Sequence, residues 1–203
     1  MLYRLAADAA ALARHFDLAA GRDPWPGGTV TPGAFAPVIT AGREFVAGPR
    51  LDRQPTRLIP RQWGVPPPPL ASDPARTILT VRNPDSPFWI GNLRNSEFRC
   101  LVPATAFMAW GRIDPVSGKR RQHWLSCADQ PLFAMAGVWK DSEVPSFAVV
   151  TCEANAALRS LGHDRMPVIL PPSAGAQQTW LRGGWDSVKG LIAPYSSSLL
   201  SEG

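Results

Sequence analysis

One histidine and the amino terminus are the groups of this chain best suited to chemistry. His163 opens the string H-D-R-M-P-V-I-L, and a histidine can accept or donate a proton near neutral pH. The α-amine of Met1 has an ordinary pKa of about 7.7–8.0, so much of it is neutral and nucleophilic near pH 8. The two other histidines, His15 and His123, fall in an expected helix and beside an expected strand, and we assign them no role.

The three cysteines favour neither a disulfide framework nor a metal site. Cys100, Cys127 and Cys152 are odd in number, widely spaced and set in apolar runs, where a free cysteine is usually a small buried hydrophobe. No C-x-x-C pair suggests zinc, so we expect no metal and no cofactor. Free thiols also predict a reducing, cytoplasmic compartment. A peptidase pairing Cys152 with His163 is disfavoured, because nothing near Cys152 in sequence would activate its thiol.

The charge balance is compatible with nucleic-acid binding. The chain has a net charge of +5 and a sequence pI of about 9.6, and all but three of its 21 cationic side chains are arginine. Arginine pairs bidentately with phosphate and stacks on bases. The same bias could reflect a GC-rich genome, so composition leaves both interpretations open. No run of eighteen apolar residues and no apolar leader region occur, so we expect neither a membrane span nor a signal peptide.

The elements that must position these groups are short. Helical spacing predicts a helix within residues 6–18 and another over 153–161, whereas the Pro- and Gly-rich residues 23–37 are expected to form a loop. Residues 98–107 read as one strand, with Pro103 suggesting an edge or a bulge. Residues 124–126 and 132–139 are expected to pair across a turn. The irregular mixture predicts an α+β fold on an antiparallel or mixed sheet, in one domain over residues 1–203.

Six strings, in order along the chain, resemble motifs of the SOS response-associated peptidase (SRAP) family. Residues 1–5 resemble M-C-G-R-F, Trp63-Gly64 resembles the start of W-G-L-I-P, and residues 80–82 stand where the family has N-A-R. Residues 99–110 resemble R-C-L-I-P-A-x-G-F-Y-E-W, residues 151–155 resemble T-T-E-A-N, and the string at His163 is itself a family hallmark. The resemblance runs over about residues 1–181.

This resemblance implies a compact fold around a mostly antiparallel, barrel-like β core that binds single-stranded DNA in a basic groove. In the family, an N-terminal cysteine exposed after removal of the initiator Met reacts with the aldehyde of an abasic site. Its amine forms a Schiff base and its thiol closes a thiazolidine ring, which leaves a stable DNA–protein cross-link. The family name also records a proposed autoproteolytic activity.

Three of the departures from the family pattern bear on its chemistry. Leu2 replaces the cysteine, so the thiol needed beside the amine is missing, and its bulk predicts that Met1 is retained. Ala109 replaces the glutamate that manages protons and cannot act as an acid or base. Thr80 replaces the asparagine of N-A-R and keeps only a hydroxyl. These changes predict a pseudoenzyme that has lost the family's cross-linking chemistry.

Other positions keep the family residue. Arg4 and Arg82 are candidate phosphate ligands, although each could instead pair with a surface carboxylate. Thr151 could bond a phosphate or cap the next helix. Trp63 could stack on a base or lie in the core. The resemblance places His163 near the abasic sugar, where it would assist ring opening or proton transfer.

Three functions remain open from the sequence. The first is single-stranded DNA binding, at abasic or damaged sites, by a monomer that is cytoplasmic and joins the nucleoid when bound to DNA. The second is a weak abasic-site lyase acting through a Schiff base on the Met1 α-amine. The third is a paralogue whose groove serves a protein partner. DNA binding predicts that Arg4, Arg82 and the arginines of residues 50–61 share one concave face.

Overall fold

The computed structural model describes residues 2–18, 24–41, 55–69, 71, 73 and 75–202. Its strands are β1 (Tyr3–Leu5), β2 (Gly28–Val30), β3 (Phe35–Thr40), β4 (Arg57–Trp63), β5 (Thr80–Val81), β6 (Arg99–Ala104), β7 (Ala106–Ile113), β8 (Arg120–Cys127), β9 (Phe133–Lys140), β10 (Ser146–Glu153), β11 (Arg165–Pro167) and β12 (Leu200–Glu202). The α-helices are α1 (Ala9–His15), α2 (Ile90–Arg94), α3 (Ala156–Ser160), α4 (Ala174–Arg182) and α5 (Trp185–Val188), with short 3₁₀ turns at Ser96–Phe98, Lys189–Leu191 and Ser197–Leu199.

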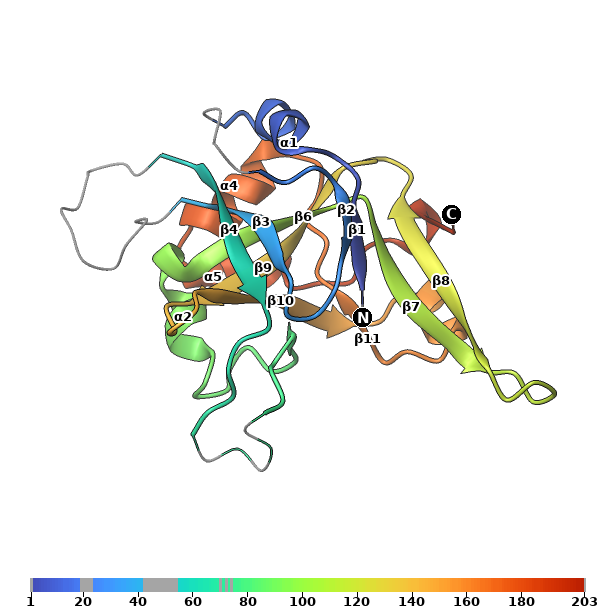
Figure 1. The fold of residues 1–203 in the computed structure, drawn as a ribbon. Coiled ribbons are helices and arrows are strands. Elements are labelled where there is room, and N and C mark those ends of the chain that lie inside the picture. The colour runs from blue at the N-terminus through green and yellow to red at the C-terminus, as the bar shows by residue number, and fades with distance from the viewer. Residues whose placement is uncertain are drawn as a thin grey trace.

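A closed ring of five strands forms the centre of the molecule. Going round it, β10 pairs with β4, β4 with β3, β3 with β6, β6 with β9, and β9 returns to β10. Among the strands that the structure describes, only the pairings of β10 with β4 and with β5 are parallel. The expected α+β fold with a mostly antiparallel, barrel-like core is therefore confirmed (Figure 1). Closure leaves the ring without a free edge, which removes a common route to aggregation.

A second, five-stranded sheet lies beside the ring in the order β12-β8-β7-β1-β2. Its hairpin of β7 and β8 projects from the body of the protein (Figure 1). The chain passes from the ring into this sheet at Thr105, whose backbone N–H donates to the Arg4 carbonyl over 2.7 Å. The Thr105 hydroxyl also accepts from the N–H of Ala6 over 3.2 Å. These bonds fix β1 beside the corner between the two sheets.

The core fills the ring and the space under the second sheet with apolar side chains. Trp180 of α4 lies fully buried, and its indole N–H is shared between the carbonyls of Cys100 (2.9 Å) and Gly137 (3.2 Å). Gly137 on β9 is needed because a Cβ there would lie 2.7 Å from a methyl of Val102. Tight contacts of this kind pin α4 against the ring.

Strand β10 is hydrogen-bonded along both edges. One edge pairs with β4 and then β5, and the other pairs with β9 and then β11. Seven of its eight residues, Ser146 to Cys152, are buried, which fits a near-continuous apolar run paired on both sides. Because β10 ends where β5 and β11 meet it, residues far apart in the sequence come together there.

Several expected elements differ from the structure. The segment expected as a loop contains β2 and the start of β3, and the strand expected over 98–107 is divided at Thr105 into β6 and β7. Pro103 lies in a strand with neighbours on both sides, and at this position β6 is paired with β9. On its other side, β6 pairs with β3 only at Cys100 and Leu101, so no hydrogen bond to β3 is lost where proline lacks an N–H. Residues 124–126 and 132–139 do not pair, because β8 and β9 belong to different sheets.

The helices carry identifiable caps. Asp8 accepts from the N–H of Ala11 over 2.7 Å at the start of α1, and Ser173 caps α4. Asn155 caps α3 by accepting from the N–H of Leu158 over 3.1 Å, so the helix-capping role considered for Thr151 belongs to Asn155. Within the described residues, no helix is both long and apolar enough to cross a membrane.

One prediction concerns Arg99, which is wholly buried and donates to the carbonyls of Leu93 (3.0 Å) and Gly183. Arg99→Ala should lower the free energy of unfolding by about 3 kcal/mol, because two carbonyls lose their donor and a cavity opens. Chemical denaturation would measure it. Arg94→Ala, at an exposed position on α2, is the matched control and should change stability by less than about 0.5 kcal/mol. Equal stability of the two variants would contradict this role for Arg99.

Candidate nucleic-acid interface

A cavity of about 530 Å³ opens where the end of β10 meets its neighbours. The segment leading into β5, the middle of β7, helix α3 and strand β11 form its walls. Its lining residues are Arg76, Thr77, Ile78, Leu79, Thr80, Arg82, Phe107, Met108, Ala109, Trp110, Thr151, Leu158, His163, Arg165, Met166 and Pro167. Five positions singled out from the sequence, at Thr80, Arg82, Ala109, Thr151 and His163, therefore converge on one space.

The edge of β7 closest to the cavity is only partly covered by β1. Tyr3 pairs with Phe107, and the N–H of Met108 donates to the Leu2 carbonyl over 2.9 Å. Leu2 thus lies beside the lining residue Met108, which precedes Ala109 on β7. Met1 lies outside the described residues, so its predicted role in a Schiff base is not located by the structure.

His163 lies at the same edge of β7, two residues beyond Met108, where it contacts Trp110. Its Nε2 lies 2.7 Å from the Trp110 carbonyl oxygen, which can only accept, so Nε2 carries a proton. In the neutral ring this leaves Nδ1 as a proton acceptor. The His163 backbone is set by the end of α3, where its N–H donates to Leu158 and Gly162 adopts φ +91. That left-handed turn suits glycine and directs the next residue into the cavity.

Three arginines among the described residues line the cavity, and no acidic residue is found in that part of its wall. Arg82 on the rim pairs with Asp164 over 2.8 Å, and both side chains are mostly exposed. An exposed pair of this kind is worth about 0–1 kcal/mol, so a phosphate could compete for the guanidinium. Arg76 lies in the segment that leads into β5 and is exposed. The cavity therefore favours an anionic ligand.

Arg165 is the cation most firmly held. Its Nε donates to the Thr151 hydroxyl over 3.1 Å, and one of its terminal nitrogens donates to the Thr151 carbonyl. The Thr151 hydroxyl in turn donates its proton to the Val81 carbonyl over 2.8 Å. Because that proton is committed, the interpretation of Thr151 as a phosphate donor is wrong in this structure. Thr151 instead connects β5 to Arg165 and fixes the arginine at the cavity.

The interpretation of Trp63 as a base-stacking residue is also wrong. Its ring is fully buried, meets Tyr3 edge-on at 5.1 Å between centroids, and lies 6.4 Å from Phe147. Its indole N–H donates to the Leu79 carbonyl over 3.1 Å. Strand β4 turns this side chain toward the core, so it supports the cavity wall from behind.

The prediction that Arg4, Arg82 and the arginines of residues 50–61 share one concave face is wrong for the described residues, because only Arg82 of that set lines the cavity. Arg4 lies on the outer face of the five-stranded sheet, 4.4 Å above the ring of Trp124, rather than in the cavity. Arg61 of β4 is buried, and its guanidinium lies 4.8 Å from the centre of the indole of Trp139 on β9. Arg50 and Arg53 lie outside the described residues. Arg82, Arg165 and Arg76 are the cations that the cavity brings together.

Sequence reasoning missed Arg76, Arg165 and Trp110 as lining residues. Arg165 stands two positions after His163 in the same string, so the string itself carried the signal for it. Trp110 remains 37% exposed, which is unusual for so large an aromatic side chain and marks it as available to a ligand. Arg76 lacked any sequence signal, because it lies between the proline-rich stretch and the string at residues 80–82 and belongs to no motif.

The cysteines do not contribute to the cavity. Cys152 is buried, and burial raises the pKa of its thiol to about 11. A neutral buried thiol is a poor nucleophile, which argues against a peptidase built on Cys152 and His163. Among the residues that the structure describes, no three His, Cys, Asp or Glu side chains are grouped as a metal site would require.

Known proteins resemble this chain in both sequence and fold. The family model described as SOS response associated peptidase (SRAP) matches residues 2–201. The abasic site processing proteins YoqW and YoaM of Bacillus subtilis (strain 168) are 30% and 32% identical to it over 108 residues, which is 49% of this chain and 46% and 45% of theirs. The chain thus aligns with about half the length of these relatives.

Solved structures extend the similarity to the whole fold. A protein of Bacteroides thetaiotaomicron superposes with a TM-score of 0.74 at 17% identity and covers 99% of this chain and 90% of its own. A phage-related protein of Bordetella bronchiseptica gives a TM-score of 0.72 at 21% identity over 100% of this chain and 92% of its own. At such identities the likeness concerns the fold.

One prediction tests the role assigned to Thr151. Thr151→Val keeps the shape of the side chain but leaves the Val81 carbonyl without a donor and Arg165 without one acceptor. We expect a loss of about 1–2 kcal/mol in the free energy of unfolding. Thr151→Ser, which retains the hydroxyl, should recover most of that loss. Equal losses in the two variants would show that the hydroxyl has no such function.

A second prediction concerns the thiols. Burial raises the pKa of Cys152 to about 11 and that of Cys127 to about 12, and Cys100 is raised further, so all three are protonated near pH 8. An aromatic disulfide reagent should therefore label the native protein slowly at pH 8, and three thiols should react once the chain is unfolded. Rapid labelling of one native thiol would reveal an activated cysteine.

Proposed function

Because this chain belongs to the SOS response associated peptidase family, we propose that it binds single-stranded DNA at abasic or damaged sites, with the lesion in the cavity beside β7. The observation that carries the proposal is the set of lining arginines, Arg76, Arg82 and Arg165, in a wall whose described part has no acid. Guanidinium groups recognise phosphate bidentately, and a strand threaded past three of them would be held through its backbone.

The cavity also suits a damaged nucleotide. Its lining is largely apolar between the arginines, with Phe107, Met108 and Leu158 facing the same space. A sugar without a base could enter while its flanking phosphates meet the cations at the rim. Trp110, at the exposed side, offers a flat surface on which a neighbouring base could stack. The relatives named abasic site processing proteins support this choice of lesion.

We propose further that binding is non-covalent. Closure of a thiazolidine needs an amine and a thiol on adjacent carbons, and position 2 carries Leu2, which has no thiol. Ala109, beside the cavity, offers no carboxylate to move a proton. His163 keeps a proton-accepting Nδ1, but it has no nucleophilic thiol to serve. Recognition without cross-linking would make this protein a binding module on the family scaffold.

An alternative is weak lyase activity. The Met1 α-amine would add to the abasic aldehyde and release water to give a Schiff base. Without a thiol, the imine would hydrolyse or lose the 3′-phosphate by β-elimination, with His163 Nδ1 accepting a proton. This alternative is favoured by the bond between Leu2 and Met108, which holds the residue after Met1 at a lining strand.

The third function, a groove used by a protein partner, has less support. The tetraproline at residues 66–69 is compatible with a protein contact. A protein ligand would need acidic groups to match the arginines of the cavity. Loss of DNA binding in the experiments below would make this function the leading one.

The first experiment separates binding from chemistry. Purified protein is mixed with a labelled single strand, intact or with one abasic site, with and without borohydride, and run on native and denaturing gels. We expect a native shift on the abasic strand and no denaturing-stable adduct. An adduct only after borohydride, with strand cleavage in its absence, would establish the lyase. Absence of any shift at low salt would exclude both DNA functions.

The second experiment tests the cations. Arg82→Ala and Arg76→Ala should each weaken single-strand binding and lower the slope of log K against log salt by about 0.7, the change expected for one phosphate contact. Fluorescence anisotropy at several salt concentrations would measure both quantities. Arg159→Ala is the control, because Arg159 is exposed on α3, pairs with Glu153 and is not among the lining residues. Unchanged affinity in both test variants would refute the proposal.

A further inference from the structure

The hairpin of β7 and β8 continues the cavity outward along residues 110–122, which we call the hairpin arm. Trp110 lines three adjoining hollows: the main cavity, a second one with Arg112, Arg120 and His163, and a third with Lys119 and Arg120. His163 is shared by the first two hollows and Arg120 by the last two. Because they share these lining residues, we take the series of three hollows from the cavity onto the arm together and call it the path.

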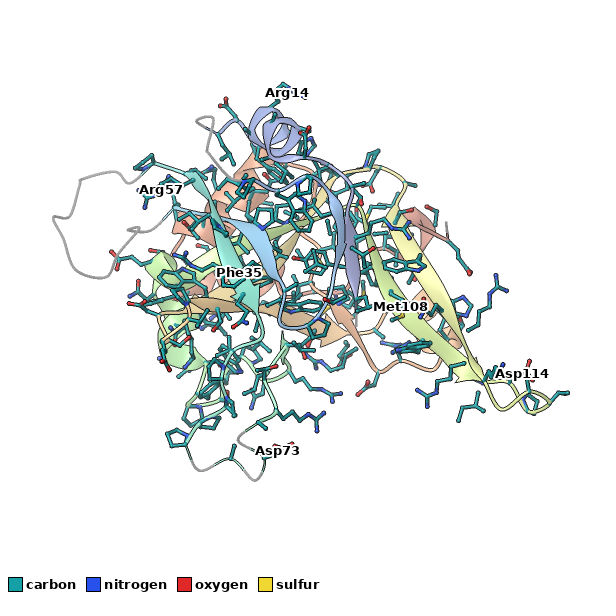
Figure 2. The ribbon with its side chains drawn as sticks, in the orientation of Figure 1. Arg14, Phe35, Arg57, Asp73, Met108 and Asp114 are labelled. Carbon is teal, nitrogen blue, oxygen red and sulfur yellow. The ribbon has the colours of Figure 1, made fainter. Side chains whose placement is uncertain are left out.

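The arm has the composition of a phosphate-binding strip. It carries Arg112, Lys119, Arg120 and Arg121 against a single acid, Asp114. Asp114 lies at the far end of the hairpin, well away from Met108 at its base (Figure 2). Its carboxylate accepts the N–H groups of Val116 and Ser117, each over 2.8 Å, and so shapes the turn.

The two faces of the arm differ in what their cations do. On one face, Arg121 lies 3.7 Å from the Glu202 carboxylate, and His123 lies 2.9 Å from the same group. On the other face, Arg112 and Arg120 line the path that begins at Trp110. No salt bridge involving these two arginines is found among the described residues. The cations that face the path are thus available, whereas Arg121 is engaged by Glu202.

The base of the arm is held against the cavity by α3. Gly162 approaches the Arg112 side chain so closely that a Cβ on Gly162 would lie 3.3 Å from Arg112 Cγ. The turn that aims His163 into the cavity therefore also packs against Arg112. A ligand in the cavity and a ligand on the arm would meet one connected surface.

We propose that the hairpin arm is an extension of the binding site, which holds through Arg112 and Arg120 the phosphates of the single strand that leaves the cavity on one side of the lesion. This inference rests on the proposed DNA binding and predicts that one flank of the lesion is held more tightly than the other. Each residue of a β-strand advances the chain by about 3.3 Å, which is close to the 3.4 Å rise of one stacked nucleotide. Cations along the arm can therefore meet successive phosphates of a single strand. Trp110 lies at the junction, where it separates the lesion from the strand on the arm.

An asymmetric footprint is the consequence to measure. The probes are fluorescent single strands with one tetrahydrofuran abasic analogue, either with short flanks or extended on the 5′ or the 3′ side only. Wild-type protein should gain about tenfold in affinity when one flank is extended and little when the other is. The double variant Arg112→Ala/Arg120→Ala should lose that gain, and its salt slope on the extended probe should fall by about 1.4.

The control is Arg121→Ala, which removes a neighbouring cation from the opposite face and should keep the full gain. If the double variant gains as much as wild type, or if Arg121→Ala loses as much as the double variant, the arm is not the extension. If wild type binds the short probe but neither extension helps, the arm is refuted and the cavity proposal stands. If wild type binds none of the probes, the proposed function fails and the arm with it.

Discussion

The whole arrangement depends on strand β10 being paired along both of its edges. Its first half closes the ring by joining β4 to β9, and its second half takes β5 on one edge and β11 on the other. A strand with both edges occupied has its backbone donors and acceptors satisfied by neighbours, so it can be buried almost throughout. The same pairing brings residues 80–82 and 163–167 to one place, where the cavity forms.

The Thr151 hydroxyl on β10 positions an arginine at the cavity. It donates to the backbone of β5 and accepts from Arg165, so a buried strand sets the position of a cation at the cavity. His163 is placed in a comparable way, by backbone bonds at the end of α3 and by the Trp110 carbonyl. Leu2 and Ala109 sit within the same backbone frame. Substitution at these two positions can therefore change the chemistry while the scaffold and its cations persist.

The arginines of this protein divide into two physical classes. Arg99 and Arg61 are buried, and they serve the fold through carbonyl bonds and an aromatic contact. Burial lowers the pKa of Arg99 to about 10, because the charged form loses its contact with water. The hydrogen bonds from its guanidinium to the Leu93 and Gly183 carbonyls offset this and join α2 and the end of α4 to the ring. Exposed arginines lie around the cavity, along the hairpin arm and beside Trp124, and others, such as Arg94 and Arg159, lie away from these places. Net charge by itself does not distinguish these classes.

The sequence by itself determined the local features and the family. Helical spacing predicted α1 and α3, and motifs in a fixed order predicted the barrel-like fold. Only the tertiary structure decided which side chains face the ligand. Trp63 is buried, the Thr151 proton is used inside the protein, Arg165 reaches the cavity, and β8 and β9 belong to different sheets. The reason is that caps and periodicity act over a few residues, whereas burial and strand pairing are decided by partners distant in the chain.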